Sequence, residues 1–224
     1  MSIAQNLQSI KEKIQNSNHQ VNLIVVSKTI DEERISQAID SGCQIFGENK
    51  VIEAKNKWIN LKNQYRNIKL HLIGHLQTNK AKDAVQIFDV IQTLDSEKLA
   101  EVLAKEIIKQ NKSIEIFVQI NIGEEEQKSG INPKDAQNFI RKMIEEYKLP
   151  ITGVMAIPPA DEDPTLYFAL LKKIADENNL KNISMGMSGD FETAIMMGAN
   201  FIRLGTAIFG ERNLTEAQTQ IIDL

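Results

Sequence analysis

The sequence predicts a single α/β domain, a TIM-type (β/α)8 barrel with an extra N-terminal helix. Three observations favour this fold: short apolar segments alternate strictly with helical segments, there are eight such segments, and all of them fit into 224 residues. Strict alternation is typical of a parallel sheet, and eight units in a chain of this length favour a closed barrel. We therefore expect residues 1–224 to form one domain.

The first predicted element is a helix, because Ile3, Leu7, Ile10 and Ile14 recur at helical spacing and form one apolar face. The strands are short apolar runs of the kind that is buried on both faces. In chain order they are predicted at 23–26, 44–46, 70–73, 87–92, 114–120, 151–157, 182–184 and 201–204. Helices are predicted after the first seven strands, at about 31–42, 48–61, 96–109, 164–177 and 189–197, with two more beginning near 79 and 133.

An open, doubly wound sheet is the competing fold, since it is built from the same strand-helix units. Its most specific sequence mark is a G-x-G-x-x-G turn after the first strand. In this chain that turn reads Ser27-Lys28-Thr29-Ile30. No linker or low-complexity segment indicates a second domain.

The composition is that of an ordinary globular protein, with 42% apolar and 25% charged residues. A formal net charge of −4 argues against general nucleic-acid binding, and no apolar run approaches the roughly 20 residues of a membrane span. Residues 1–5 lack the features of a signal peptide. Cys43 is the only cysteine, so neither an internal disulfide nor a Cys/His zinc site is expected. We expect a cytoplasmic, metal-free protein.

Lys28 is the most informative residue at the C-terminal ends of the predicted strands, where a parallel barrel carries its functional groups. Burial at the end of an apolar strand would lower the pKa of its amine, and the neutral amine is the form that makes a Schiff base with an aldehyde. The alternative is a lysine that extends from the strand end into solvent. Taken alone, the residue leaves both interpretations open.

Two turns rich in small residues follow the seventh and eighth strands, where TIM barrels most often bind phosphate. One contains Ser188, and the other contains Gly205 and Thr206. Small residues let backbone N–H groups approach an anion. Ser188 could instead be a plain helix N-cap, and the charge of Asp190 would repel a phosphate. The presence of two such turns on adjacent strands favours a phosphate.

Arg203 lies inside the apolar eighth strand, two residues before Gly205. A buried guanidinium needs a partner, because an unpaired buried charge is very costly. That partner is either an acidic neighbour in a structural ion pair or a ligand at the mouth of the barrel. Lys28, the two turns and Arg203 together fit a phosphorylated aldehyde that is bound as an imine.

At this point the sequence resembles the pyridoxal phosphate homeostasis protein family, whose barrel is similar to the N-terminal domain of alanine racemase. The resemblance covers nearly the whole chain and rests on four ordered motifs. They are 26–29 (VSKT), 46–49 (FGEN), 71–80 (HLIGHLQTNK) and 184–195 (SMGMSGDFETAI), the last running on to 203–210 (RLGTAIFG).

The resemblance implies that the cofactor is pyridoxal 5′-phosphate (PLP). It implies that Lys28 forms the internal aldimine and that Arg203 faces the pyridine nitrogen. The other implied contacts are Asn49 near the ring hydroxyl and, at the phosphate, Ser188, Gly205 and Thr206.

An arginine opposite the pyridine nitrogen disfavours its protonation, which makes the ring a poorer electron sink than one paired with aspartate. Racemisation would also need a second acid/base on the face opposite Lys28. In alanine racemase-like enzymes this group is a tyrosine lent by a partner subunit. Here Tyr65, Tyr147 and Tyr167 fall on the helical side of the pattern, away from the barrel mouth. His75 is the one plausible substitute, and it could equally be a hydrogen-bonded loop residue.

We therefore predict a protein that binds PLP as a lysine aldimine and serves intracellular PLP (vitamin B6) homeostasis, with little or no turnover and no catalytic residue. Its partners would be PLP itself and PLP-dependent apoenzymes, without nucleic acid or membrane. Only about 20 residues follow the last strand, so the β-domain of the racemases is not expected and a monomer is. The alternatives are a small PLP-dependent amino-acid racemase and a phosphate-ligand barrel in which Lys28 only pairs with an anion.

Overall fold

The computed structural model describes residues 2–210, which form a closed parallel barrel. Its strands pair in the order β1 to β8, and β8 pairs with β1 to close the ring. The predicted barrel is therefore confirmed, and the open sheet is wrong. The strands are β1 (Asn22–Val26), β2 (Ile45–Glu48), β3 (Lys69–Leu72), β4 (Val90–Leu94), β5 (Glu115–Ile120), β6 (Ile151–Ala156), β7 (Asn182–Ser184) and β8 (Phe201–Leu204).

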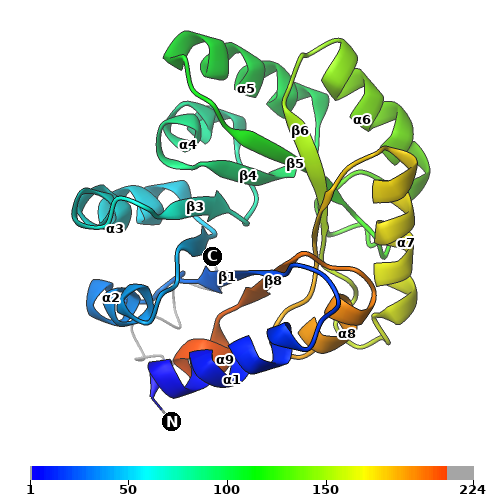
Figure 1. Ribbon diagram of the computed structural model, residues 1–224. Coiled ribbons are helices and arrows are strands. Elements are labelled where there is room, and N and C mark those ends of the chain that lie inside the picture. Colours follow the sequence, from blue (N-terminus) through cyan, green and yellow to red (C-terminus); the bar gives the residue numbers. More distant parts are fainter. Residues whose placement is uncertain (1, 211–224) are drawn as a thin grey trace.

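The helices form an outer layer around the strands (Figure 1). They are α1 (Ile3–Gln15), α2 (Glu32–Asp40), α3 (Val51–Gln64), α4 (Ala81–Ile87), α5 (Glu97–Gln110), α6 (Ala136–Glu145), α7 (Thr165–Glu177), α8 (Phe191–Met196) and α9 (Thr206–Phe209). Two 3-10 turns, η1 (Thr78–Lys80) and η2 (Pro133–Asp135), precede α4 and α6. No helix within residues 2–210 combines the length and the apolar character needed to cross a membrane.

The extra N-terminal helix is confirmed. It packs beside a very short helix that follows the last strand of the barrel. Helix α9, which was not predicted, has only four residues, and α1 packs beside it and beside α2 in the outer layer (Figure 1). Leu7 and Ile10 of α1 are buried. Asn6 donates a side-chain hydrogen bond to the carbonyl of Ile208 at 2.8 Å, which ties α1 to α9.

Several element boundaries differ from the sequence prediction by a few residues, and two of them concern buried segments. Residues 87–89 were predicted to belong to a strand, but Ile87 ends α4 and β4 begins at Val90. The end of the helix is as apolar as the strand, so periodicity cannot separate them. Glu48 was expected to begin a helix, yet it ends β2, where it pairs with Leu72 of β3. Its fully buried carboxylate accepts a hydrogen bond from Trp58 at 3.0 Å.

The barrel interior has an apolar layer and, nearer the mouth, a polar layer. Phe201 and Arg203 are two residues apart on β8, so both face inward, with Arg203 one step closer to the C-terminal ends of the strands. Phe201 packs against the buried cluster of Val90, Phe117 and Met155. Arg203 therefore belongs to the polar layer, which would contact a ligand bound at the mouth.

Candidate functional site

One cavity at the C-terminal ends of the strands brings together all six residues that the sequence and the resemblance selected. Its volume is about 340 Å³, and we call it the Lys28 cavity. Its size suits a small molecule. It is lined by Lys28, Asn49, Ser188, Arg203, Gly205 and Thr206, together with Val26, Ile73, Ile157, Met187 and Gly189.

Lys28 is positioned by the strand that precedes it. It follows the end of β1 by two residues, and β1 pairs with β2 at Val26 and with β8 at Val25. The side chain is half-buried and lines the cavity. The position between two strand ends supports the functional interpretation of Lys28 over that of a lysine extended into solvent.

Arg203 is almost fully buried, and both described groups that accept hydrogen bonds from its side chain are neutral. One terminal nitrogen donates to Ser184 Oγ at 2.8 Å and the other to the carbonyl of Ala156 at 2.9 Å. Burial lowers the pKa of the guanidinium to about 10, against the opposing effect of the Asp190 charge. No ion pair between residues of the described range includes Arg203, so the structural ion pair considered above is wrong. The cavity thus contains a buried cation that forms no ion pair with a described carboxylate, although the charge of Asp190 acts on it from farther away.

Behind Arg203 a chain of hydrogen bonds crosses the barrel interior. Ser184 Oγ donates to Gln92 Oε1 at 2.7 Å, and Gln92 Nε2 lies 2.9 Å from His71 Nδ1. All of these side chains are buried. Burial, assisted by the charges of Lys69 and Lys62, lowers the pKa of His71 to about 3. His71 is therefore neutral, its Nδ1 accepts from the Gln92 amide, and the chain fixes Ser184 as an acceptor for Arg203.

Ser184, Gln92 and His71 were not among the predicted site residues. The available signal was the presence of polar residues inside apolar strands, at 71, 92 and 184. A buried polar side chain needs a hydrogen-bond partner, and strands of a barrel share one interior. What could not be predicted is the pairing, since it depends on the register between strands that are distant in the sequence.

The two small-residue turns meet through their hydroxyl groups. Thr206 Oγ1 donates to Ser188 Oγ at 3.0 Å, and the backbone N–H of Ala207 donates to the same oxygen at 3.3 Å. Ser188 is not a helix N-cap, because Asp190 occupies that position before α8 and accepts from the N–H of Met187. The N-cap alternative is therefore wrong, and Ser188 faces the β8 turn instead.

The first of these turns depends on a glycine. Gly186 has φ +91°, and a Cβ at this position would lie 2.5 Å from Cβ of Ala194. A larger residue would both strain the backbone and push α8 away from the turn. Gly186 therefore lets the chain turn sharply enough to bring Ser188 to Thr206.

Asn49 lies at the border between the Lys28 cavity and a neighbouring cavity of about 680 Å³. His75 lines this neighbour and is not among the described residues that line the Lys28 cavity. Its Nδ1 lies 3.1 Å from Asp95 Oδ2 and 3.3 Å from Ser129 Oγ. The structure thus supports the interpretation of His75 as a hydrogen-bonded loop residue.

The tyrosines differ from the prediction at one position. Tyr65 and Tyr147 follow the C-terminal ends of α3 and α6, at the end of the barrel opposite the mouth. Tyr167 lies in the first turn of α7, so it is at the mouth end, within the helix layer, and its hydroxyl donates to Glu162 at 2.5 Å. In the part of the chain that is described, none of the three lines the Lys28 cavity.

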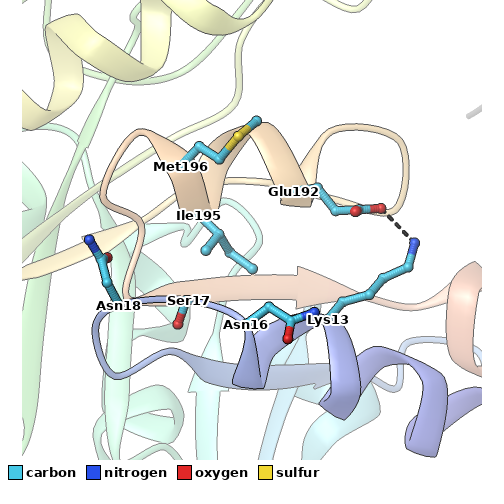
Figure 2. A pocket seen from close by; sticks show the side chains of 7 residues that line it. All are labelled: Lys13, Asn16, Ser17, Asn18, Glu192, Ile195 and Met196. Atoms are coloured by element: carbon cyan, nitrogen blue, oxygen red, sulfur yellow. Dashed lines mark hydrogen bonds and ion pairs between the residues drawn. The ribbon is translucent and has the colours of Figure 1, made fainter.

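A third cavity, of about 510 Å³, lies between α1 and α8, and we call it the α1–α8 cavity. Figure 2 shows Lys13 of α1 reaching Glu192 of α8, with Ile195 pointing from α8 toward α1 and Met196 pointing away from α1. The ion pair measures 2.5 Å and both side chains are about half exposed. Its two charges compensate each other, so the described lining of this cavity presents no unpaired charge to a ligand.

The groups around the Lys28 cavity fit a phosphorylated aldehyde. The cavity combines a primary amine, a buried cation without an ion-pair partner among the described residues, and two hydroxyls held 3.0 Å apart. Hydroxyl and guanidinium groups are suitable donors for phosphate and for a ring nitrogen. Within residues 2–210 no group of three or more His, Cys, Asp or Glu side chains is arranged to hold a metal ion.

Comparison with known proteins identifies the family of this chain. The family described as alanine racemase, N-terminal domain, matches residues 1–213. The pyridoxal phosphate homeostasis protein of Pasteurella multocida is 36% identical to the chain, and the match covers 96% of this chain and 100% of the relative.

Solved structures agree with this assignment. PipY of Synechococcus elongatus, with PLP bound, has a TM-score of 0.83 and 31% identity, over 93% of this chain and 100% of PipY. Alanine racemase of Clostridium difficile has a TM-score of 0.74 at 14% identity, over 96% of this chain and 58% of the racemase. The latter similarity shows the shared fold only.

Proposed function

We propose that this chain, which belongs to the pyridoxal phosphate homeostasis protein family, binds PLP covalently through Lys28 and stores, buffers or delivers it, with little or no turnover. The observation that carries the proposal is the meeting of Lys28, Arg203 and the Ser188–Thr206 hydroxyl pair in one cavity. PipY, which shares the fold and 31% of the sequence, is a PLP-bound relative and supports the choice of ligand. The cytoplasm is proposed as its place of action.

Each side chain has a distinct role in this proposal. PLP supplies an aldehyde, whose condensation with a lysine amine forms a C=N bond and releases one water molecule. Lys28 provides the amine, and the hydroxyls of Ser188 and Thr206 bind the phosphate beside Gly205. Asn49, which also lines the cavity, is the proposed contact of the ring hydroxyl.

Arg203 has the role that its hydrogen bonds suggest. It is held as a cation by Ser184 and Ala156, and a guanidinium can only donate. A ring nitrogen in front of it therefore accepts a hydrogen bond and stays unprotonated. A PLP ring in this state withdraws electrons less strongly from an attached amino acid, which disfavours turnover.

The composition of the cavity also favours a carrier over a racemase. Of the described residues that line it, only Lys28 and Arg203 are ionisable. His75 contacts Asp95 and Ser129 and lines the neighbouring cavity. Racemisation needs an acid/base on each face of the substrate, and among the described lining residues only Lys28 could act as one. PLP-dependent apoenzymes are the proposed recipients, and a monomer is the proposed form.

Reduction with borohydride tests covalent binding. The purified protein is incubated with PLP, reduced, digested and mapped by mass spectrometry. We expect a pyridoxyl adduct on the peptide that contains Lys28 and a visible absorbance band before reduction. A reduced protein without an adduct on Lys28 would instead support the phosphate-ligand barrel.

Deuterium exchange separates the carrier from the racemase. The PLP-loaded protein is incubated with several L-amino acids in D2O, and exchange at the α-carbon is measured. We expect exchange no faster than with free PLP. Exchange at enzyme-like rates that is lost in His75→Ala would establish the racemase.

A further inference from the structure

The turn that carries Lys28 has an unusual backbone conformation. Thr29, the next residue, has φ +61°, in the left-handed region. A β-branched residue rarely adopts this conformation, because its side chain crowds the backbone. Such strain persists only where the surrounding structure holds it in place, and it is often found at functional sites. The contacts that hold this turn are therefore of interest.

Those contacts come from three charged side chains on β2 and α3: Glu48, Glu53 and Lys57, which we call the Lys57 cluster. Lys57 Nζ lies 2.9 Å from Glu48 Oε1 and 2.8 Å from Glu53 Oε1. Glu48 is fully buried and Lys57 nearly so, with 13% of its side chain exposed. The cluster lies between β2 and α3, outside the Lys28 cavity as far as its described lining extends.

The Lys57 cluster binds the turn on both sides of Lys28. On the N-terminal side, Lys57 Nζ donates to the carbonyl of Ser27 at 2.7 Å, and Ser27 Oγ donates to Glu48 Oε1 at 2.8 Å. On the C-terminal side, Glu53 Oε1 accepts from the N–H of Thr29 at 2.5 Å. Both immediate neighbours of Lys28 are thus fixed by side chains that lie outside the described lining of the Lys28 cavity.

Stability alone does not explain a buried cluster of this kind. Burying charges costs desolvation energy, and apolar residues of similar volume often stabilise a fold as well or better. Glu48 Oε2 is buried without a hydrogen-bond partner among the described residues, which adds to this cost. A cluster that is costly and contacts both sides of one lysine is better explained by the position of that lysine.

We propose that Glu48, Glu53 and Lys57 are positioning residues that hold the Lys28 turn in its strained form and aim the amine into the cavity. This inference rests on the proposed function. The cluster thereby favours covalent capture of the PLP aldehyde, while the phosphate and the ring are bound by residues on other strands. Loss of the cluster should weaken the covalent step and leave the other contacts intact.

Two ligands separate these contributions. PLP has the aldehyde, whereas pyridoxine 5′-phosphate has the same ring and phosphate with an alcohol in its place. In Lys57→Met we expect the Kd for PLP to rise at least tenfold and the Kd for pyridoxine 5′-phosphate to stay within twofold of wild type. The matched control is Lys55→Met, on the same helix, whose ion pair with Asp83 at 3.1 Å lies away from the turn. It should bind both ligands as wild type does.

Amide hydrogen exchange in the PLP-free protein provides an independent readout. The segment 27–30 should exchange faster in Lys57→Met than in wild type or Lys55→Met, because the N–H of Thr29 loses a positioned acceptor. Glu53→Ala, at a partly exposed residue that contacts Thr29 directly, provides the same tests if Lys57→Met does not fold.

The inference is overturned if Lys57→Met or Glu53→Ala binds PLP as wild type does, or if both ligands weaken equally, which would indicate general damage to the site. Unchanged exchange at 27–30 would also overturn it. A wild-type protein that forms no adduct on Lys28 would refute the proposed function. The exchange experiment would still report on the cluster in that case, so the two failures are distinguishable.

Discussion

The Lys28 cavity and the α1–α8 cavity each contain a lysine, hydroxyl or amide groups and apolar side chains. They differ in whether a described carboxylate forms an ion pair with the cation, which is Lys13 in the α1–α8 cavity and Arg203 in the Lys28 cavity. Lys13 pairs with Glu192 at 2.5 Å and also lies 5.5 Å from the ring of Phe191. In the Lys28 cavity, Arg203 is buried among neutral groups, and Lys28 follows a strand between two neighbouring strand ends. The α1–α8 cavity is the larger of the two, at about 510 against 340 Å³.

This difference shows that volume does not locate the functional site of this barrel. In the α1–α8 cavity the positive charge is already compensated by a carboxylate in solvent, where such pairs contribute little. In the Lys28 cavity the described residues surround Arg203 without an ion pair, so a ligand at the mouth could add a direct acceptor to the weaker effect of the Asp190 charge. The site is distinguished by its buried cation and by its location at the C-terminal ends of the strands, not by the volume of the cavity.

Replacement of the lysine in each cavity provides the largest expected contrast. Lys28→Ala should abolish the visible absorbance of the PLP-loaded protein and its borohydride-dependent adduct, because no other primary amine lines the described part of that cavity. Lys13→Ala should leave both signals unchanged. Absorbance spectra and peptide mapping measure the effect, and an adduct retained in Lys28→Ala would place the covalent site elsewhere.

Removal of the buried cation should separate binding from stability. In Arg203→Met we expect PLP affinity to fall tenfold or more, about 1.4 kcal/mol. The free energy of unfolding of the PLP-free protein should change by less than about 2 kcal/mol, because the lost hydrogen bonds are offset by relief of an uncompensated charge.

Arg34→Met is the matched control for this variant. Arg34 stacks on Phe209, with 5.4 Å between the guanidinium carbon and the ring centroid, and does not line the described part of the Lys28 cavity. It should retain wild-type PLP affinity in a direct titration. Wild-type affinity in Arg203→Met, together with a large loss of stability, would show that Arg203 is structural.

The neutral His71 behind Arg203 predicts a pH dependence of stability. Its pKa is lowered to about 3 in the folded protein, from an ordinary value of 6.5. Between these values the unfolded chain binds more protons, so this contribution to stability is complete above pH 6.5 and is lost as the pH falls toward 3. From pH 7 to pH 5 the loss should be about 2 kcal/mol.

Denaturant unfolding at the two pH values measures this effect. His71→Asn, which retains a hydrogen-bonding side chain, should show a smaller acid loss by roughly that amount. An acid loss of the same size in both proteins would mean that other groups cause it. The two proteins differ only in the barrel interior beneath the Lys28 cavity, where His71 contacts Gln92.

The fold was predictable because strand and helix signals alternate without interruption, and a closed ring is the compact arrangement of eight such units. Boundaries were less predictable where burial is continuous, as at Ile87, where a helix end and a strand form one apolar run. The short α9 was not predicted. The segment 204–209 lacks a helical apolar pattern long enough to distinguish a single turn of helix from a loop.

The site was predictable where function depends on residue type and place in the strand order. Lys28 and Ser188 follow strands and Arg203 lies one residue before the end of β8, and strand ends meet at one face of a parallel barrel. Ser184, Gln92 and the Lys57 cluster were not predictable in this way, because their roles arise from contacts between strands and helices far apart in sequence. The sequence also left the partner of Arg203 open, and that partner depends on which side chains share its interior layer.

The smallest expected effect concerns the α1–α8 cavity itself. Glu192→Gln removes the charge that Lys13 contacts, in a pair whose side chains are 47% and 59% exposed. Exposed pairs contribute little, so we expect the free energy of unfolding to change by less than about 0.5 kcal/mol and PLP affinity by less than twofold. Denaturant unfolding and PLP titration measure both. Because Glu192 lies in the first turn of α8, directly after the Ser188 turn, a tenfold change in affinity would show that the two cavities are coupled through α8.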